Sequence, residues 1–92
     1  MPLALVTGAS RGLGLAFATA LAARGWALIL DARHDRELTS AAGNLGADLI
    51  AGDVTDPRHR AQLVAAVAAH GRLDLLVNNA SHLGPGLVRL GD

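Results

Sequence analysis

Three glycines near the amino terminus have the types and spacing expected of a phosphate-binding turn. Gly8, Gly12 and Gly14 directly follow the apolar run Leu3–Val6 and open a segment of helical periodicity. In such a strand–turn–helix context, Gly8 lets the chain turn off the strand, Gly12 leaves room for a pyrophosphate and Gly14 allows close helix–strand packing. The unpaired N–H groups at the helix start would then face the phosphates. The pattern therefore predicts a dinucleotide-binding turn.

Two other interpretations of these glycines are possible, a P-loop and an ordinary flexible loop. A P-loop has the pattern G-x4-G-K followed by Ser or Thr, and its lysine reaches the phosphates. Here only three residues separate Gly8 from Gly12, and the chain contains no lysine. All eight cationic side chains are arginines: Arg11, Arg24, Arg33, Arg36, Arg58, Arg60, Arg72 and Arg89. A flexible loop stays open because glycine is common (11 of 92 residues), but the flanking strand and helix favour the binding turn.

The composition limits the class of protein and its partners. Ninety-two residues make one small domain, and 51% apolar residues with a formal net charge of zero indicate a globular chain. This charge balance predicts neither a nucleic-acid partner nor binding to a membrane surface. The chain has no cysteine, and its four histidines lack i,i+3 or i,i+4 spacing, so no metal site is expected. The first residues lack a basic segment and a long apolar run, which makes a cytoplasmic location the expectation.

The elements that must position the turn alternate between strand and helix. Strands are expected at about Leu3–Thr7, Ala27–Leu30, Leu49–Ala51 and Leu73–Val77. Helices are expected at about Arg11–Ala23, between Asp35 and Gly46, and between Asp56 and Gly71. This order predicts one α/β domain over residues 1–92, with a Rossmann-type parallel sheet in the order 3-2-1-4 and helices on both faces. The tail Leu83–Asp92, with three glycines and a proline, is interpreted as a loop.

Two further motifs fall at the carboxyl ends of expected strands, where this fold binds its ligand. Asp53-Val54 follows the third strand, and Asn78-Asn79-Ala80-Ser81 follows the fourth. Each is weak alone, because an aspartate can simply cap a turn and an asparagine pair can satisfy loop backbone. Their order and spacing after the glycine-rich turn strengthen the prediction of a nucleotide site.

These three motifs together resemble the short-chain dehydrogenase/reductase family, and the likeness extends from Leu3 to about Gly84. The first motif is most similar to that of 3-oxoacyl carrier-protein reductases. The resemblance implies that the pyrophosphate and the adenosine ribose are held by Gly8, Ala9, Ser10, Arg11, Leu13 and Gly14. It also implies that Asp53 and Val54 flank the adenine, and that Asn79, Ala80 and Ser81 line the ribose side. Ser81 stands where glycine is usual in the family.

The charges after the second strand bear on the choice of cofactor. An acidic side chain at the end of that strand binds the ribose 2′-OH of NAD, whereas arginine attracts the 2′-phosphate of NADP. Counted from Gly25, the discriminating position is Ala32, followed by Arg33, and Asp31 points to the opposite face. Arg11 at a helix start, where the dipole disfavours a cation, also suggests a nearby phosphate. NADP is therefore predicted, with NAD as the alternative if the strand ends earlier; both arginines could also be solvated surface charges.

The family's catalytic machinery is the largest departure. The resemblance implies a Y-x3-K pair downstream of the asparagine motif, yet this chain contains no tyrosine and no lysine, so no catalytic residue is assigned. Leu73–Val77 is apolar on both faces, as expected of a covered interior strand and not of a sheet edge. We therefore interpret the chain as the N-terminal part of a longer NADP-dependent reductase, inactive by itself. The intact protein would act on a small carbonyl or alcohol substrate and form a homo-oligomer, a dimer or a tetramer. The alternatives are a non-catalytic dinucleotide-binding or regulatory module complete at Asp92, and a decayed structural relative.

Overall fold

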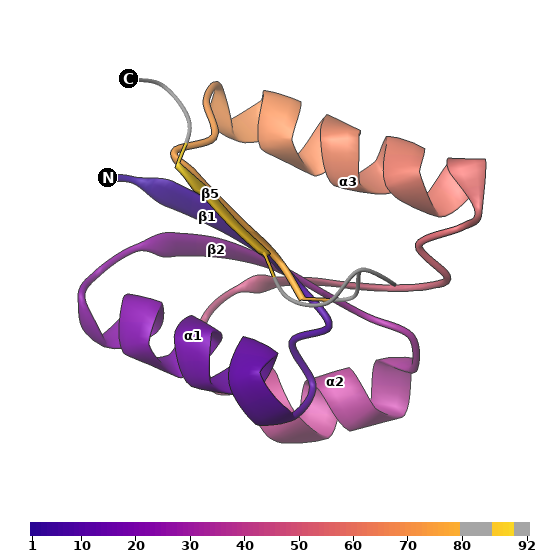
Figure 1. The fold of residues 1–92 in the computed structure, drawn as a ribbon, viewed down its shortest axis with the longest axis horizontal. Coiled ribbons are helices and arrows are strands. Elements are labelled where there is room, and N and C mark those ends of the chain that lie inside the picture. Colours follow the sequence, from indigo (N-terminus) through magenta and orange to yellow (C-terminus); the bar gives the residue numbers. More distant parts are fainter. Residues whose placement is uncertain (80–85, 90–92) are drawn as a thin grey trace.

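The computed structural model describes residues 1–79 and the strand at 86–89. Strands and helices alternate along the chain up to the fourth strand (Figure 1). The strands are β1 (Leu3–Thr7), β2 (Ala27–Ala32), β3 (Asp48–Ala51), β4 (Leu75–Asn78) and β5 (Gly86–Arg89). The helices are α1 (Gly12–Ala23), α2 (Asp35–Ala42) and α3 (Pro57–His70).

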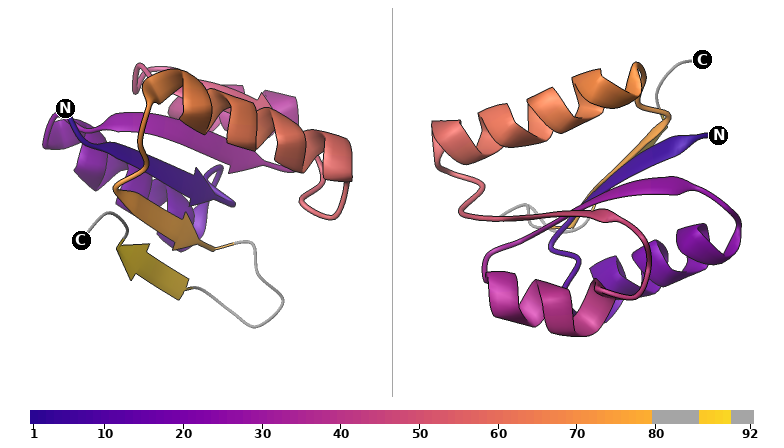
Figure 2. Two further views of the ribbon diagram at one scale, coloured as in Figure 1. Left: turned by 90° about the horizontal axis from the view of Figure 1, so that it is seen from above. Right: turned by 180° about the vertical axis from the view of Figure 1, so that it is seen from behind.

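The strands form one sheet in the order β3-β2-β1-β4-β5. The first four run parallel, with Leu5 of β1 opposite Ile29 of β2 and Leu76 of β4. The predicted parallel order 3-2-1-4 is therefore confirmed. Helices α1 and α2 cover one face of the sheet and α3 covers the other (Figures 1 and 2).

Strands β1 and β2 lie inside the sheet, and their side chains pack alternately into two apolar cores, one on each face. Val6 and Leu30 pack on the α1–α2 side, whereas Leu5 and Ile29 pack on the α3 side together with Leu63. Because both faces of these strands are covered, their sequences are apolar at consecutive positions. This two-sided burial fixes the register of β2, and with it the face to which each residue at its carboxyl end points.

Several predicted boundaries differ from those observed. Strand β2 continues to Ala32, because Ala27–Ala32 pairs with β1 over its first part and with β3 over its last. The expected fourth strand is shifted to β4, Leu75–Asn78. The prediction of a loop over Leu83–Asp92 is wrong for β5, which pairs antiparallel with β4. It covers the edge of β4, the outer strand of the predicted order 3-2-1-4, in agreement with the covered character of that strand's sequence. The remaining residues of that tail lie outside the described residues.

Helix α3 begins and ends as its sequence predicts. The Asp56 side chain accepts a hydrogen bond from the Arg58 N–H at 2.9 Å, and Pro57 occupies the first turn. Gly71 ends the helix in the left-handed conformation, with φ at 91°. This capping sets the point at which the first turn of α3 meets the end of β2.

Candidate nucleotide-binding site

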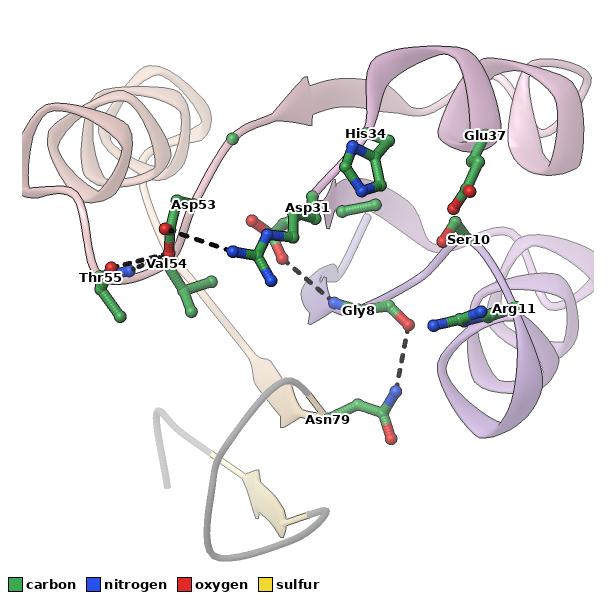
Figure 3. A pocket seen from close by; sticks show the side chains of 13 residues that line it. Gly8, Ser10, Arg11, Asp31, His34, Glu37, Asp53, Val54, Thr55 and Asn79 are labelled. Carbon is green, nitrogen blue, oxygen red and sulfur yellow. Dashed lines mark hydrogen bonds and ion pairs between the residues drawn. The ribbon is translucent and has the colours of Figure 1, made fainter.

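A cleft of about 610 Å³ lies at the carboxyl ends of the parallel strands. This is the size range of pockets that bind small molecules and cofactors. Figure 3 shows its polar lining, with the glycine-rich turn on one side and the loop after β3 on the other. The cleft is lined by Gly8, Ser10, Arg11, Asp31, Ala32, Arg33, His34, Glu37, Gly52, Asp53, Val54, Thr55 and Asn79.

The turn after β1 is held by hydrogen bonds on both sides of Gly8, which adopts a positive φ of 64°. Its N–H donates to the Asp31 carboxylate at 3.1 Å, and its carbonyl accepts from the Asn79 amide at 3.1 Å (Figure 3). The Asn79 N–H in turn donates to the Thr7 hydroxyl at 3.0 Å. The turn is therefore fixed between β2 and the end of β4, which is the arrangement expected of a preorganised binding loop.

Helix α1 starts beside this turn without a side-chain cap. Arg11 occupies the cap position in an extended conformation, and the first turn contains no acidic residue. The first N–H groups of the helix therefore have no side-chain acceptor from the cap, and the positive end of the helix dipole is not offset. Gly12 has φ at 59°, and a Cβ on Gly14 would lie 2.8 Å from the Asn79 Nδ2 atom. Gly14 therefore lets the helix start pack closely against the turn after β1, and Gly12 supplies the positive φ at which the helix begins.

The opposite wall carries an ion pair between the loops that follow β2 and β3. The Arg33 guanidinium lies 3.9 Å from the Asp53 carboxylate, and their side chains are 75% and 47% exposed. Hydrogen bonds from the Thr55 backbone N–H and hydroxyl lower the pKa of Asp53 below its ordinary value of 3.8, and Arg33 adds a smaller lowering. The lowered pKa favours the anionic form of Asp53, which lies next to Arg33 at the cleft.

The structure brings seven of the predicted site residues to the cleft: Gly8, Ser10, Arg11, Arg33, Asp53, Val54 and Asn79. Ala9 is completely buried, and its N–H donates to the Asp31 carbonyl at 2.8 Å. Gly12, Leu13 and Gly14 belong to the first turn of α1 and do not line the cleft; Leu13 is 51% exposed. The predicted Ala80 and Ser81 lie outside the described residues.

Six lining residues were not among the predicted site residues: Asp31, Ala32, His34, Glu37, Gly52 and Thr55. Only their position in the sequence could have indicated them, because each lies within two residues of a predicted site residue or in the first turn of the helix after β2. Glu37 lies beside Ser10, facing the cleft (Figure 3). Its carboxylate therefore opposes the positive charges of Arg11 and Arg33.

Asp31 occupies a different place from the one considered for a cofactor ligand. Its side chain lies on the α3 side of β2, whereas Ala32 packs with the α1–α2 core. Both carboxylate oxygens have a protein partner: one accepts from Gly8 and the other meets the His59 Nε2 atom. Asp31 thus supports the turn from beneath.

Two further properties bear on the kind of site. Within residues 1–79 and 86–89, no cluster of three or more histidine, cysteine or acidic side chains could hold a metal ion. Over the same part of the chain, none of the helices has the length and apolar character required to cross a membrane.

In the order 3-2-1-4, β2 and β3 lie on one side of β1, whereas β4 lies on the other. Gly8 after β1 and Asn79 after β4, which both line the cleft, lie at this change of side. This arrangement defines an α/β protein with a Rossmann-type fold. Residues 2–89 match the family model of the short chain dehydrogenases, and the chain belongs to this family.

Known relatives agree with this assignment. The chain is 43% identical over 83 residues to gluconate 5-dehydrogenase of Gluconobacter oxydans, covering 84% of this chain and 32% of that protein. It is 42% identical over 81 residues to the 3-oxoacyl acyl-carrier-protein reductase of Escherichia coli, covering 85% and 33%. The crystal structure of L-sorbose reductase from Gluconobacter frateurii, complexed with NADPH and L-sorbose, superimposes with a TM-score of 0.79 at 36% identity, covering 87% and 33%. The chain thus spans about a third of the length of these relatives.

Proposed function

We propose that this chain is the N-terminal, NADP(H)-binding part of a reductase that transfers hydride between the nicotinamide and a carbonyl or alcohol group. One observation carries the proposal: the turn residues Gly8 and Ser10, the cap residue Arg11 of α1 and the Arg33–Asp53 pair all line one cleft. Backbone N–H groups at a helix start suit a pyrophosphate, and an arginine suits a further phosphate. The relative whose structure contains NADPH supports the same class of cofactor.

The preference for NADP over NAD is argued from the charges near the end of β2. Ala32 is buried and uncharged, and the carboxylate of Asp31 is engaged by Gly8 and His59. Arg11 and the largely exposed Arg33 can both reach an anion in the cleft. Glu37 and Asp53 are the opposing carboxylates at the cleft. The preference for the 2′-phosphate therefore rests on Arg11 and Arg33, together with the lack of a free carboxylate at Asp31 and Ala32.

Titration calorimetry on the full-length protein tests this preference. The Arg33→Ala variant should weaken NADP binding by about 1–3 kcal/mol, the scale of hydrogen bonds to a charged group, and should change NAD binding much less. Arg24→Ala is the matched control, because Arg24 is an exposed arginine at the far end of α1. Equal weakening of both nucleotides by Arg33→Ala would show that Arg33 does not bind the 2′-phosphate.

The proton transfer that accompanies hydride transfer is assigned to a segment downstream of this chain. When bound, the nicotinamide supplies or accepts the hydride. The described cleft supplies binding groups, and the family resemblance places the acid, a tyrosine assisted by a lysine, after the asparagine motif. Sequencing the gene beyond codon 92 should therefore reveal a Y-x3-K motif in frame. A stop codon at that point would favour the alternative of a non-catalytic dinucleotide-binding or regulatory module.

The remaining proposals concern the intact protein. We expect a small-molecule carbonyl or alcohol substrate, a cytoplasmic location and a homo-oligomeric assembly, either a dimer or a tetramer. Sedimentation of the full-length protein tests the assembly. A monomer at micromolar concentration would contradict it.

A further inference from the structure

A buried Asp–His pair lies beneath the floor of the cleft. Asp31 near the end of β2 and His59 in the first turn of α3 have side chains only 2% and 3% exposed. The His59 Nε2 atom faces one oxygen of the Asp31 carboxylate. Removing a carboxylate from water is costly unless it is hydrogen-bonded or paired, and an apolar residue would fill this space without that cost. The pair therefore calls for a role beyond filling the core.

The pair is connected to the glycine-rich turn by two hydrogen bonds from β2. The second oxygen of the Asp31 carboxylate accepts from the Gly8 N–H at 3.1 Å, and the Asp31 carbonyl accepts from the Ala9 N–H at 2.8 Å. Gly8 and His59 are separated from Asp31 by 23 and 28 residues along the chain. Asp31 thus joins the turn after β1 to the start of α3.

A glycine in the cleft wall leaves the space that the His59 ring occupies. A Cβ on Gly52 would lie 2.7 Å from the His59 Cγ atom and closer still to Nδ1, so only glycine fits against the ring. Gly52 is fixed by donating its N–H to the Ala32 carbonyl at 2.9 Å. The Nδ1 atom of His59 has no hydrogen-bond partner in the described part of the chain, so Nε2 is the atom that ties the ring to Asp31.

We propose that Asp31 and His59 are positioning residues that hold the glycine-rich turn in the shape needed to bind the nucleotide. His59 fixes one carboxylate oxygen of Asp31, and this orients the other oxygen toward the Gly8 N–H. The Gly8 carbonyl accepts from Asn79 on the opposite side, so both backbone polar groups of Gly8 are hydrogen-bonded. The pair acts through the turn, and the proposal rests on the nucleotide binding proposed above.

The first test uses the full-length protein without nucleotide, so it does not depend on that binding. The Gly8 amide proton should resonate downfield because it is bound to a carboxylate, and a scalar coupling across this hydrogen bond to the Asp31 carboxylate carbon should be detectable by NMR. Asp31→Ala should move the Gly8 signal upfield. Asp31→Asn, which retains an oxygen acceptor, should keep most of the downfield shift. Absence of the coupling in the unmodified protein would overturn the proposal even if no variant folds.

The second test measures NADP affinity. Asp31→Ala and His59→Leu should each weaken binding about tenfold or more, the scale of one hydrogen bond to a charged group. The double variant should be little weaker than either single variant, because the two residues act as one unit. Asp31→Asn and His59→Gln keep a hydrogen-bonding atom at the required place and should stay within about threefold.

Leu63→Ala is the matched control, because Leu63 is buried in the same helix and packs in the α3 core without reaching the turn. It should lower the free energy of unfolding and leave the NADP affinity of the folded protein unchanged. If Asp31→Ala weakens binding no more than Leu63→Ala does, the pair is merely structural and the proposal fails. If the unmodified protein binds no nucleotide at all, the proposed function fails, while the Gly8 signal still decides whether the pair holds the turn.

Discussion

Gly14→Ala should destabilise the protein, although alanine is normally the better residue in a helix. Gly14 lies in the first turn of α1 with no Cβ between the helix and the turn after β1. An added Cβ would lie 2.9 Å from the carbonyl carbon of Gly8, closer still to its oxygen, and 2.8 Å from the Asn79 Nδ2 atom. Gly8 cannot move away easily, because its N–H donates to Asp31 and its carbonyl accepts from Asn79.

The magnitude follows from opposing effects. Exchange of glycine for alanine inside a helix stabilises by about 0.5–1 kcal/mol where space allows. Overpacking against a fixed backbone costs about 1–3 kcal/mol, and loss of the Asn79–Gly8 hydrogen bond adds about 0.5–1.5 kcal/mol. The net result should be a loss of about 0.5–4 kcal/mol in the free energy of unfolding. Because the turn must shift, nucleotide affinity should fall as well.

Urea denaturation and calorimetric titration of the full-length protein measure the two effects. Ala16→Gly is the matched control: Ala16 is exposed in the same helix, and its exchange reports the helix propensity alone, about 0.5–1 kcal/mol with unchanged nucleotide affinity. If Gly14→Ala stabilises the protein by the amount that Ala16→Gly destabilises it, then the close approach of α1 to Gly8 is not a constraint and the reasoning is refuted.

Two other predictions concern the cleft and its chemistry. The Thr55→Ala variant removes one of the hydrogen bonds that lower the pKa of Asp53, so this pKa should rise toward 3.8 in a carbon-13 NMR titration, with Thr19→Ala, an exposed threonine of α1, as control. A carboxylate whose pKa is lowered by folding stabilises the folded state at pH values above its pKa in the unfolded chain, and this stabilisation should be lost as the pH falls through the pKa of folded Asp53. An unchanged Asp53 pKa in Thr55→Ala would contradict the assignment. The 92-residue chain alone should not oxidise NADPH with any carbonyl compound, because it contains neither tyrosine nor lysine and general acid catalysis contributes about 10²–10⁴-fold. Oxidation in proportion to the concentration of the purified monomeric chain would require another proton donor.

Local patterns were enough to predict the sheet and its order. The strands are short apolar runs, and each helix is bounded by a glycine or a capping residue close to its end, so these signals lie within a few positions of the boundaries that they set. The end of β2 was missed because it depends on pairing. The charged Asp31 interrupts the apolar run of the strand, yet Asp31 and Ala32 pair with Ile50 and Ala51 of β3. Strand β5 was missed for the same reason: it is only four residues long, it lies in a tail with three glycines and a proline, and its partner is β4.

The residues of the candidate site fall into the same two groups, those marked by local sequence and those that only the fold brings to the cleft. Gly8, Arg11, Asp53 and Asn79 were predicted because family motifs and strand ends mark them in the sequence, and the structure places them at one cleft. Glu37 reaches that cleft only because α2 starts directly after β2 and turns its first residues inward. A residue of this kind becomes predictable only when the direction of the helix is known.

The Asp31–His59 pair shows why supporting residues are harder to find than contacting ones. Its geometry requires the register of β2, the right-handed crossover that brings α3 onto one face, and a glycine at position 52 that admits the ring. None of these is a local property of either residue. Both backbone polar groups of Gly8 are nevertheless hydrogen-bonded, the N–H to Asp31 and the carbonyl to Asn79. The shape of a motif that was evident in the sequence therefore depends on partners 23 and 71 residues away. A glycine-rich turn transferred without those partners should therefore retain the sequence motif but not the fixed geometry that favours nucleotide binding.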